Sequence, residues 1–274
     1  MKFALHAGSF RHTNVAIDIR TAQVSGFDGI ELFLPRVKRY LDAGFTSADL
    51  AQTLGGLQVP MIDFLLPIES TDPSTQERIA SECGRMARLA QAIGCPAIQV
   101  VALSDFSSPT WADQREILIS RLRELTDIAN PYGVRLAIEC AVFSPFRQLS
   151  QALEVIEAVG PDKVGLCLDT WHIWLSGTPW EQVAQLDPDL ILSVQLADAA
   201  PRSGPEWRDE DRTVLPGKGV VPLGEAIDAV LATGYRGYWS YEAFSRHHCE
   251  WHPEDFASAM LDGMRDLTAN RVTR

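Results

Sequence analysis

Residues 164–169, VGLCLD, form a short apolar run that ends on an acidic residue, and runs of this form recur along the chain. They return as RLAIE at 135–139, ILSVQLAD at 191–198 and GYWSYEAF at 237–244. Runs that are apolar throughout, rather than alternating, are typical of strands covered on both faces of a parallel sheet. Earlier runs at 3–7, 29–33, 61–67 and 97–103 bring the predicted strands to eight.

The segments between these runs have helical periodicity. Residues 75–93 place apolar side chains three and four positions apart, and Gly94 ends the pattern ahead of Pro96. Residues 223–231 and 253–267 are predicted helices of the same kind, the second beginning with proline. Glycine precedes the next strand in SGFDGIEL, AIGCPAIQV, NPYGVRLAIE and TGYRGYWSYE, as expected where a left-handed residue ends a helix.

The alternation of strands and helices predicts repeated βα units around a parallel sheet. A chain of 274 residues has the length of one (β/α)8 barrel, and no Gly-, Ser- or Pro-rich linker divides it. We therefore predict an α/β fold, a TIM barrel, as a single domain over residues 1–274. The irregular stretch from Ala199 to Pro222 then lies after the seventh strand, on the catalytic face.

Composition excludes several classes of function. The net charge is -12 with Lys and Arg scattered, so a nucleic-acid partner is not indicated. We expect a soluble cytoplasmic protein, because there is no apolar stretch near the ~20 residues of a membrane span and no leader. The five cysteines are odd in number and lack CxxC spacing, which predicts reduced, structural thiols.

Four polar residues, Glu139, Asp169, Gln195 and Glu242, stand at the ends of the last four predicted strands. In a parallel barrel these ends open on one face, where three carboxylates would repel one another unless a cation lies between them. Oxygen ligands suit Mn²⁺ or Mg²⁺ ahead of Co²⁺ or Zn²⁺. The alternative is that each residue is a helix cap or a loop salt bridge.

Two further residues suit substrate handling. His172 follows Asp169 by three residues in DTWH and is positioned to donate a hydrogen bond or carry a proton. Its alternative role is a bond to a nearby backbone carbonyl. Arg212, in the long irregular stretch, can grip an anionic or polarised oxygen with its fork of donors, although an exposed Arg is more often solvated.

His6 and several aromatic residues complete the predicted rim. His6 lies near the end of the first strand, and Trp171 is predicted to offer a flat wall for a sugar or ring. The same role is predicted for Trp174, Trp207, Trp239 and Trp251, although buried packing is the preferred interpretation for Trp239. The tract SRHHCEWH at 245–252 suggests a second metal site, but a role at the substrate rim in an exposed loop is favoured.

These residues resemble a known family, the xylose-isomerase-like TIM barrels. It includes ketose 3-epimerases, inosose isomerases and dehydratases, dehydroshikimate dehydratases and type IV endonucleases. The resemblance is strongest from Ala137 to Phe244, in which a third ligand position follows the Asp of DTWH by 26 residues. It implies that His172 and Arg212 contact substrate and that the metal ligands are Glu139, Asp169, Gln195 and Glu242.

The chain also departs from parts of this family. Related epimerases usually carry His at the third ligand position, whereas Gln195 resembles the dehydroshikimate dehydratases. A three-zinc nuclease is disfavoured, because Thr213 replaces the His of an Asp-Arg-His triplet and the third and fourth strands supply no His.

The resemblance implies that Glu139 and Glu242, assisted by His172, move a proton next to a metal-polarised carbonyl through an enediolate. We predict a divalent-metal-dependent isomerase or epimerase of a small keto-sugar, polyol ketone or sugar phosphate. The alternatives are a dehydratase of the dehydroshikimate or inosose type and a non-catalytic ligand-binding barrel. Related barrels often dimerise, so a homo-oligomer stays open, without a membrane partner.

Overall fold

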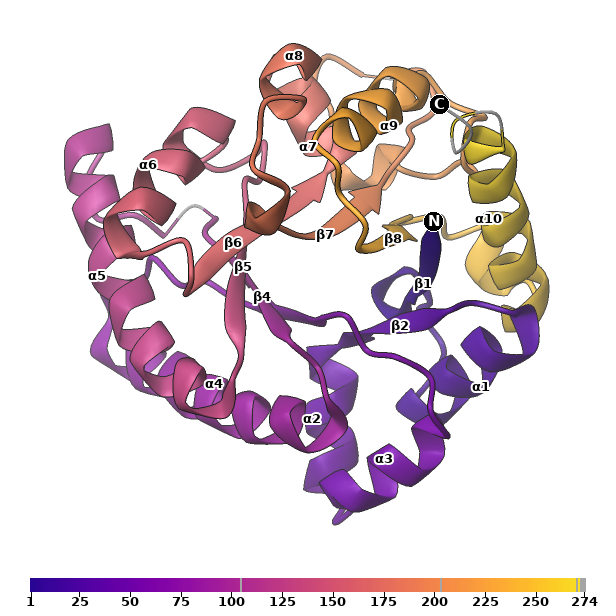
Figure 1. The fold of residues 1–274 in the computed structure, drawn as a ribbon, viewed down its shortest axis with the longest axis horizontal. Coiled ribbons are helices and arrows are strands. Elements are labelled where there is room, and N and C mark those ends of the chain that lie inside the picture. Colours follow the sequence, from indigo (N-terminus) through magenta and orange to yellow (C-terminus); the bar gives the residue numbers. More distant parts are fainter. Residues whose placement is uncertain (104, 203, 270, 272–274) are drawn as a thin grey trace.

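A computed structural model describes residues 1–103, 105–202, 204–269 and 271. It shows eight parallel strands closed into a barrel and surrounded by helices, which confirms the predicted fold (Figure 1). Each strand pairs with the next in the chain, and the last pairs with the first. The strands are β1 (Lys2–His6), β2 (Gly29–Phe33), β3 (Ile62–Leu65), β4 (Ala97–Val101), β5 (Arg135–Glu139), β6 (Val164–Asp169), β7 (Ile191–Leu196) and β8 (Tyr238–Tyr241).

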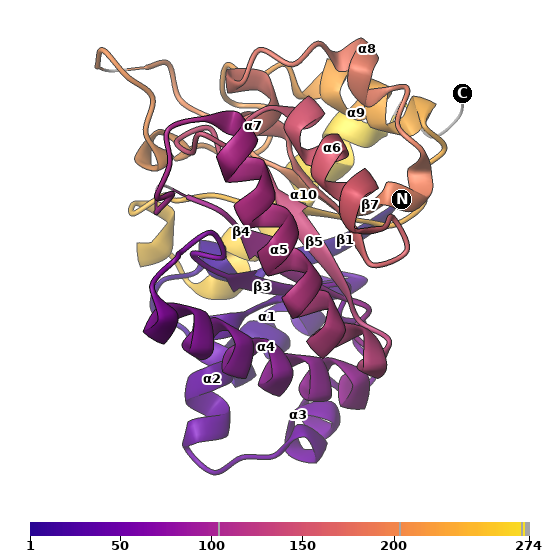
Figure 2. The ribbon, with the colours of Figure 1, turned by 90° about the vertical axis from the view of Figure 1, so that its left-hand side faces the viewer.

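The helices lie on the outside of the barrel, where α5 can be seen in front of the strands (Figure 2). They are α1 (Val15–Ser25), α2 (Leu34–Asp42), α3 (Ser47–Leu54), α4 (Pro73–Ile93), α5 (Trp111–Ala129), α6 (Leu149–Val159), α7 (Thr170–Leu175), α8 (Trp180–Val183), α9 (Leu223–Ala232) and α10 (Pro253–Thr268). The predicted helices at 75–93, 223–231 and 253–267 correspond to α4, α9 and α10. Among the described helices, none combines the length and apolar character needed to cross a membrane.

Local sequence explains where these helices begin and end. Asp72 caps α4 by accepting a hydrogen bond from the Thr75 backbone, and Pro73 occupies the first turn, where no backbone donor is required. Gly94 ends the helix with a φ of 72°, in the left-handed region that other residues adopt at a cost. The predicted glycine punctuation between helix and strand is thus confirmed.

The barrel interior changes character along its axis. One layer inside the barrel is a small apolar group, Met61, Ala97, Ala137 and Cys167, whose residues precede the polar residues on β3–β6 by two positions. Because inward-facing residues are two apart along a strand, the next inward position on β5 is Glu139. The interior is therefore apolar at the bottom and polar towards the carboxyl ends, where loops can carry a site.

The segment that was predicted to be irregular, 199–222, follows β7. In its described part it contains one 3-10 turn, Asp209–Asp211, directly before Arg212. The Phe244 backbone N–H donates to the Arg212 carbonyl at 2.7 Å, which ties this segment to the chain that leaves β8. This backbone contact brings Arg212 to the mouth of the barrel.

Candidate active site

Three acidic residues and a glutamine lie at the carboxyl ends of four successive strands, where the sequence places them. Glu139 is the last residue of β5, and Asp169 is the last residue of β6. Gln195 is one residue from the end of β7, and Glu242 directly follows β8. Asp169 and Gln195 are register partners, so their side chains start at the same height in the barrel. All four are buried.

Arg212 joins two of these carboxylates. Its Nη1 donates to Asp169 Oδ2 at 2.9 Å and to Glu242 Oε2 at 2.5 Å, while Nη2 donates to Asp209 Oδ1 at 2.7 Å. One nitrogen shared by two carboxylates brings them close together. The side chain is only 3% exposed, so the alternative of a solvated surface arginine is wrong.

The Arg212 guanidinium lies against two aromatic rings. Its central carbon is 4.8 Å from the ring centroid of Trp171 and 4.4 Å from that of Phe244, within range of cation–π attraction. Trp171 is fully buried, so its indole supports the arginine and presents no open wall in this conformation. Within the described part of the chain nothing accepts a hydrogen bond from the Arg212 Nε–H, which leaves one buried donor available.

Asp169 has two structural roles at once. Its Oδ1 accepts hydrogen bonds from the backbone N–H groups of Trp171 at 2.7 Å and His172 at 3.0 Å, and so caps α7. Its other oxygen pairs with Arg212. The alternative of a helix cap therefore holds for one oxygen of Asp169, and the second oxygen still faces the cluster.

His172 has a defined tautomer. The Val142 backbone N–H donates to its Nδ1 at 3.1 Å, so the ring proton of the neutral imidazole lies on Nε2, which is 3.8 Å from Glu139 Oε1. This contact differs from the alternative of a bond to a backbone carbonyl. Burial lowers the pKa of His172 to about 4, so the ring is a neutral N–H donor at pH 7.

The carboxylates have unequal proton affinities. Burial, reinforced by the charges of Asp169 and Glu242, raises the pKa of Glu139 well above its usual value. Burial also raises the pKa of Glu242, although Arg212 and His6 oppose the shift. For Asp169 burial is outweighed by His172, Arg212 and the capping N–H, so its pKa is lowered.

We call Glu139, Asp169, Gln195, Glu242, His172 and Arg212 the outer cluster. It holds three carboxylates and one guanidinium, because its imidazole is neutral. If all three carboxylates ionise, two negative charges are left, which equals the charge of one divalent cation. Glu139, Asp169 and His172 also offer ligand atoms within 4.8 Å of one another.

Gln195 provides a test of whether this mouth fits a cation. Its Nε2 donates to Glu31 Oε2 at 3.1 Å, and its Oε1 is buried with no hydrogen-bond partner among the described residues. A buried acceptor without a partner costs free energy unless something else pairs with it. The donor set of carboxylate and amide oxygens fits a hard divalent ion.

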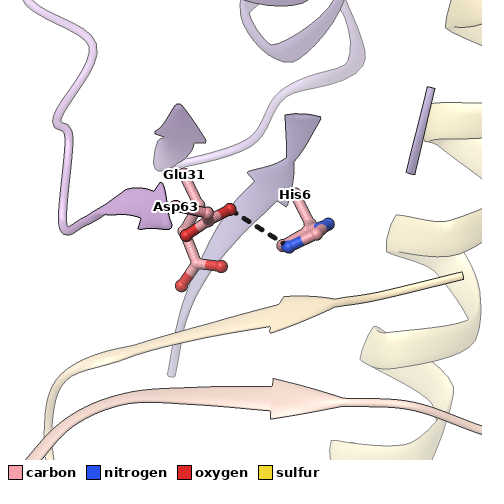
Figure 3. Close-up of side chains that lie close together, drawn as sticks. All are labelled: His6, Glu31 and Asp63. Atoms are coloured by element: carbon pink, nitrogen blue, oxygen red, sulfur yellow. Dashed lines mark ion pairs between the residues drawn. The ribbon is translucent and has the colours of Figure 1, made fainter. Parts of the chain in front are cut away.

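A second group, the inner cluster of His6, Glu31 and Asp63, comes from β1, β2 and the neighbouring β3 (Figure 3). His6 Nε2 lies 3.1 Å from Asp63 Oδ2 and 3.6 Å from Glu242 Oε1, so the two clusters adjoin. Burial lowers the pKa of His6, but Asp63 and Glu242 outweigh it and raise the pKa to about 9. Burial and the charge of Asp63 raise the pKa of Glu31 to about 7.

His6 was predicted to line the pocket near the end of the first strand. The structure places it 2% exposed, with Nδ1 within 3.1 Å of Ser9 Oγ. It contacts Glu242 and is as deeply buried as the other residues of the site, so its role in lining the pocket stays a prediction.

The remaining tryptophans do not form one wall. Trp239 is buried, as preferred, whereas Trp251 is 39% exposed on the surface. Trp174 and Trp207 contact each other edge to face with ring centroids 5.5 Å apart.

The histidine-rich tract at 245–252 does not converge on one point. His248 Nδ1 lies 2.6 Å from Ser245 Oγ, and His252 pairs with Glu254 on the surface. Among the described residues, the groups that could hold a metal do not include this tract, in agreement with the interpretation as an exposed loop.

Glu31 and Asp63 were missed at sequence level, as was Gln99, whose Nε2 donates to Glu139 Oε2 at 3.0 Å. A signal was present, since each is a polar residue within an apolar strand run, GIELF, MIDFLLP or AIQVVAL. The rule that selected the residues at the ends of the apolar runs did not find these three, because each lies inside its run.

A closed barrel with buried acidic residues at the carboxyl ends of its strands has the architecture of a TIM-barrel enzyme, and comparison with known proteins specifies the family. The family model described as xylose isomerase-like TIM barrel matches residues 19–267, and the chain belongs to this family. An inosose isomerase of Halalkalibacterium halodurans is 25% identical over 275 residues, which cover 97% of this chain and 96% of the relative.

Two other comparisons widen this picture. A 3-dehydroshikimate dehydratase of Pseudomonas aeruginosa is 29% identical over 264 residues, which cover 89% of this chain and 38% of that relative. A crystal structure of the IOLI protein with a bound zinc atom superposes with a TM-score of 0.90 at 24% identity, covering 98% of each chain. The chain is an enzyme from the isomerase and dehydratase part of this family, which sets aside the non-catalytic alternative.

Proposed function

We propose that the chain is a divalent-metal-dependent isomerase of a small cyclic polyol ketone of the inosose type. The observation that carries the proposal is the outer cluster, with three buried carboxylates, one guanidinium and an unpaired amide oxygen at the same mouth. Inosose isomerases among the relatives, matched over most of their length, support the substrate class.

The residues that would hold the cation are Glu139, Asp169, Gln195 and Glu242. The bound cation would polarise the substrate carbonyl and stabilise negative charge on its oxygen. The donor set favours Mn²⁺ or Mg²⁺, and the zinc bound by the IOLI protein adds Zn²⁺ to the ions worth testing.

Isomerisation of a hydroxy ketone requires that a proton leave the hydroxyl-bearing carbon and return to the former carbonyl carbon. Glu242 or Glu139 acts as the base, because burial raises the pKa of both and makes each a better proton acceptor than an exposed carboxylate. Gln99 donates a hydrogen bond to Glu139, and the imidazole of His6 lies 3.6 Å from Glu242.

Two donors suit the substrate oxygens. The Nε2–H of neutral His172 faces the cluster and can donate to an oxygen or shuttle a proton between adjacent oxygens. The buried Nε–H of Arg212, which donates to nothing else in the described chain, suits a second substrate oxygen. The indole ring of Trp171 packs against the guanidinium of Arg212 and helps to hold it in place.

A second candidate function is dehydration, in which the same proton removal is followed by loss of a neighbouring hydroxyl as water. Gln195 at the third ligand position and the dehydratase relatives favour it. The free cysteines fit a reducing compartment, so we also propose that the enzyme works in the cytoplasm.

The test is incubation of the metal-loaded enzyme with an inosose or with 3-dehydroshikimate in deuterated buffer, followed by chelation and NMR. Isomerisation would give a new ketone with deuterium at one carbon and every oxygen retained. Loss of water, or an aromatic product from 3-dehydroshikimate, would assign a dehydratase instead. No exchange with either compound would refute the proposed substrate class.

A further inference from the structure

Glu31 lies on β2 yet contacts residues of β7 and β8. It is fully buried, and its two oxygens accept three hydrogen bonds. Ser193 donates to Oε1, while Oε2 accepts from Gln195 Nε2 at 3.1 Å and from Ser240 Oγ at 2.8 Å. A carboxylate in a barrel interior is costly to bury, so these donors are the reason it is tolerated there.

The hydrogen bond from Gln195 to Glu31 fixes which way the amide group of Gln195 points, whereas the two serine hydrogen bonds have no such effect. An amide side chain has one donor branch and one acceptor branch, and Glu31 Oε2 accepts hydrogen bonds from both Gln195 and Ser240. Glu31 therefore turns the NH2 branch of Gln195 towards itself and the oxygen branch away. That oxygen, Oε1, is buried with no partner in the described chain.

We infer that Glu31 is a positioning residue that fixes the amide of Gln195 with its oxygen presented to the cation. This inference rests on the proposed metal site. Gln195 is the register partner of Asp169, so its side chain starts from the same height in the barrel as a carboxylate of the outer cluster. Without the acceptor at Glu31, the amide is free to rotate and present its NH2 group, which cannot bind a cation.

The experiment measures Mn²⁺ affinity calorimetrically on metal-stripped protein, so it does not depend on turnover. Glu31→Leu should weaken binding about 10–100-fold, the usual effect of losing a residue that orients a metal ligand. Glu31→Gln should bind almost as tightly as the wild type, because its amide oxygen still accepts from Gln195 and its NH2 group can donate to Ser193. This variant also controls for the loss of negative charge near the cation.

Ser240→Ala is the matched control, since it removes a different hydrogen bond to the same oxygen of Glu31 and leaves the amide contact intact. Its Mn²⁺ affinity should equal that of the wild type. Glu31→Asp, which keeps the charge but withdraws the carboxylate by one methylene, should weaken binding and serves if Glu31→Leu does not fold.

A double-mutant cycle separates action through Gln195 from an independent effect. If Glu31 acts through Gln195, Glu31→Leu combined with Gln195→Ala binds no more weakly than Gln195→Ala alone. Losses that multiply, or wild-type affinity in both Glu31→Leu and Glu31→Asp, would overturn the positioning role while leaving the metal site intact. Wild-type affinity in Gln195→Ala, or no stoichiometric binding by the wild type, would overturn the ligand set and the positioning role together.

Discussion

The inner and outer clusters lie next to each other in one barrel but differ in how their charge is balanced. The inner cluster contains its own cation, because the pKa of His6 is raised to about 9. The outer cluster has three carboxylates against one guanidinium, and its imidazole has a pKa lowered to about 4. The inner cluster thus has one imidazolium against two carboxylates, one of which, Glu31, has a pKa raised to about 7, whereas the outer cluster has an excess of two carboxylates over its guanidinium.

This difference in charge predicts that the two clusters contribute differently to folding and to function. Asp63 pairs with His6, so substitutions in this pair should act mainly on stability, whereas Glu31 also holds the amide of Gln195 and should affect cation binding as well. Buried atoms that have no hydrogen-bond partner among the described residues occur in both clusters. They are the Gln195 amide oxygen and the Arg212 Nε–H in the outer cluster, and His6 Nε2 and both Asp63 oxygens in the inner cluster, where His6 and Asp63 form an ion pair at 3.1 Å. Because the outer cluster has the larger excess of carboxylates, substitutions in it should act mainly on the bound cation and on turnover.

The largest effect should come from removing the cation. Chelation followed by desalting should lower kcat/KM by roughly 1000-fold or more, because charge stabilisation by a metal ion supplies several kcal/mol of the barrier reduction. Adding back Mn²⁺, Mg²⁺, Co²⁺ or Zn²⁺ in turn should restore activity and rank the ions. Metal-free protein that keeps full turnover would show that the outer cluster needs no cation.

Replacing the base should abolish proton transfer but not metal binding. Glu242→Gln or Glu139→Gln keeps an oxygen ligand and removes the basic group, so kcat should fall by roughly 10²–10⁴-fold. Substrate deuterium exchange measures this step, and elemental analysis measures the retained metal. Exchange at the wild-type rate in both variants would make His172 the better candidate for the base.

The inner cluster should respond in the opposite way. Asp63→Asn removes the partner of a buried charge, and the free energy of unfolding of the chelated protein should fall by about 3–5 kcal/mol. Folding raises the pKa of His6 from 6.5 to about 9, so its contribution is full below pH 6.5 and is lost as the pH rises through 9. Urea unfolding at several pH values measures both effects.

Asp169→Asn is the matched comparison, because it changes a carboxylate of the outer cluster in the same way. Metal content should fall in this variant and persist in Asp63→Asn. If the two variants lose metal equally, or if Asp63→Asn unfolds like the wild type, the division between the clusters is wrong.

The smallest effect concerns the buried thiols. Cys83, Cys95, Cys140 and Cys167 are buried, and burial raises the pKa of Cys83 and Cys95 to about 12. In the native protein at pH 8, a thiol reagent should modify Cys249 alone, without loss of activity. The other four thiols should react only after denaturation, and rapid modification of a second thiol would show that the interior of the protein opens to solvent.

Much of the outer cluster could be predicted from local sequence. Glu139, Asp169, Gln195 and Glu242 each stand at the end of an apolar run, and a parallel barrel gathers such ends on one face. Asp169 shows the limit of this reasoning. A helix cap and a cluster ligand look the same in sequence, and in the structure its two oxygens divide these roles.

Arg212 and Trp171 were predicted to lie at the mouth of the barrel, but the residues that they contact were not predicted. The contact from Arg212 to Asp169 spans 43 residues and the contact to Glu242 spans 30, and both depend on how an irregular segment folds back over the mouth. No periodic pattern in the sequence predicts how this irregular segment folds. Trp171 is buried against the guanidinium because the same segment covers the mouth of the barrel.

Local sequence was sufficient to predict the eight strands, the helices between them and the strand-end positions of the acidic residues, because apolar periodicity and glycine punctuation act over a few neighbouring residues. Which polar residues meet inside the barrel depends on contacts between distant strands. Glu31 and Gln195 are 164 residues apart, and their contact arises because closing the sheet brings β2 across from β7. The direction of that single amide depends on a partner that no local pattern specifies.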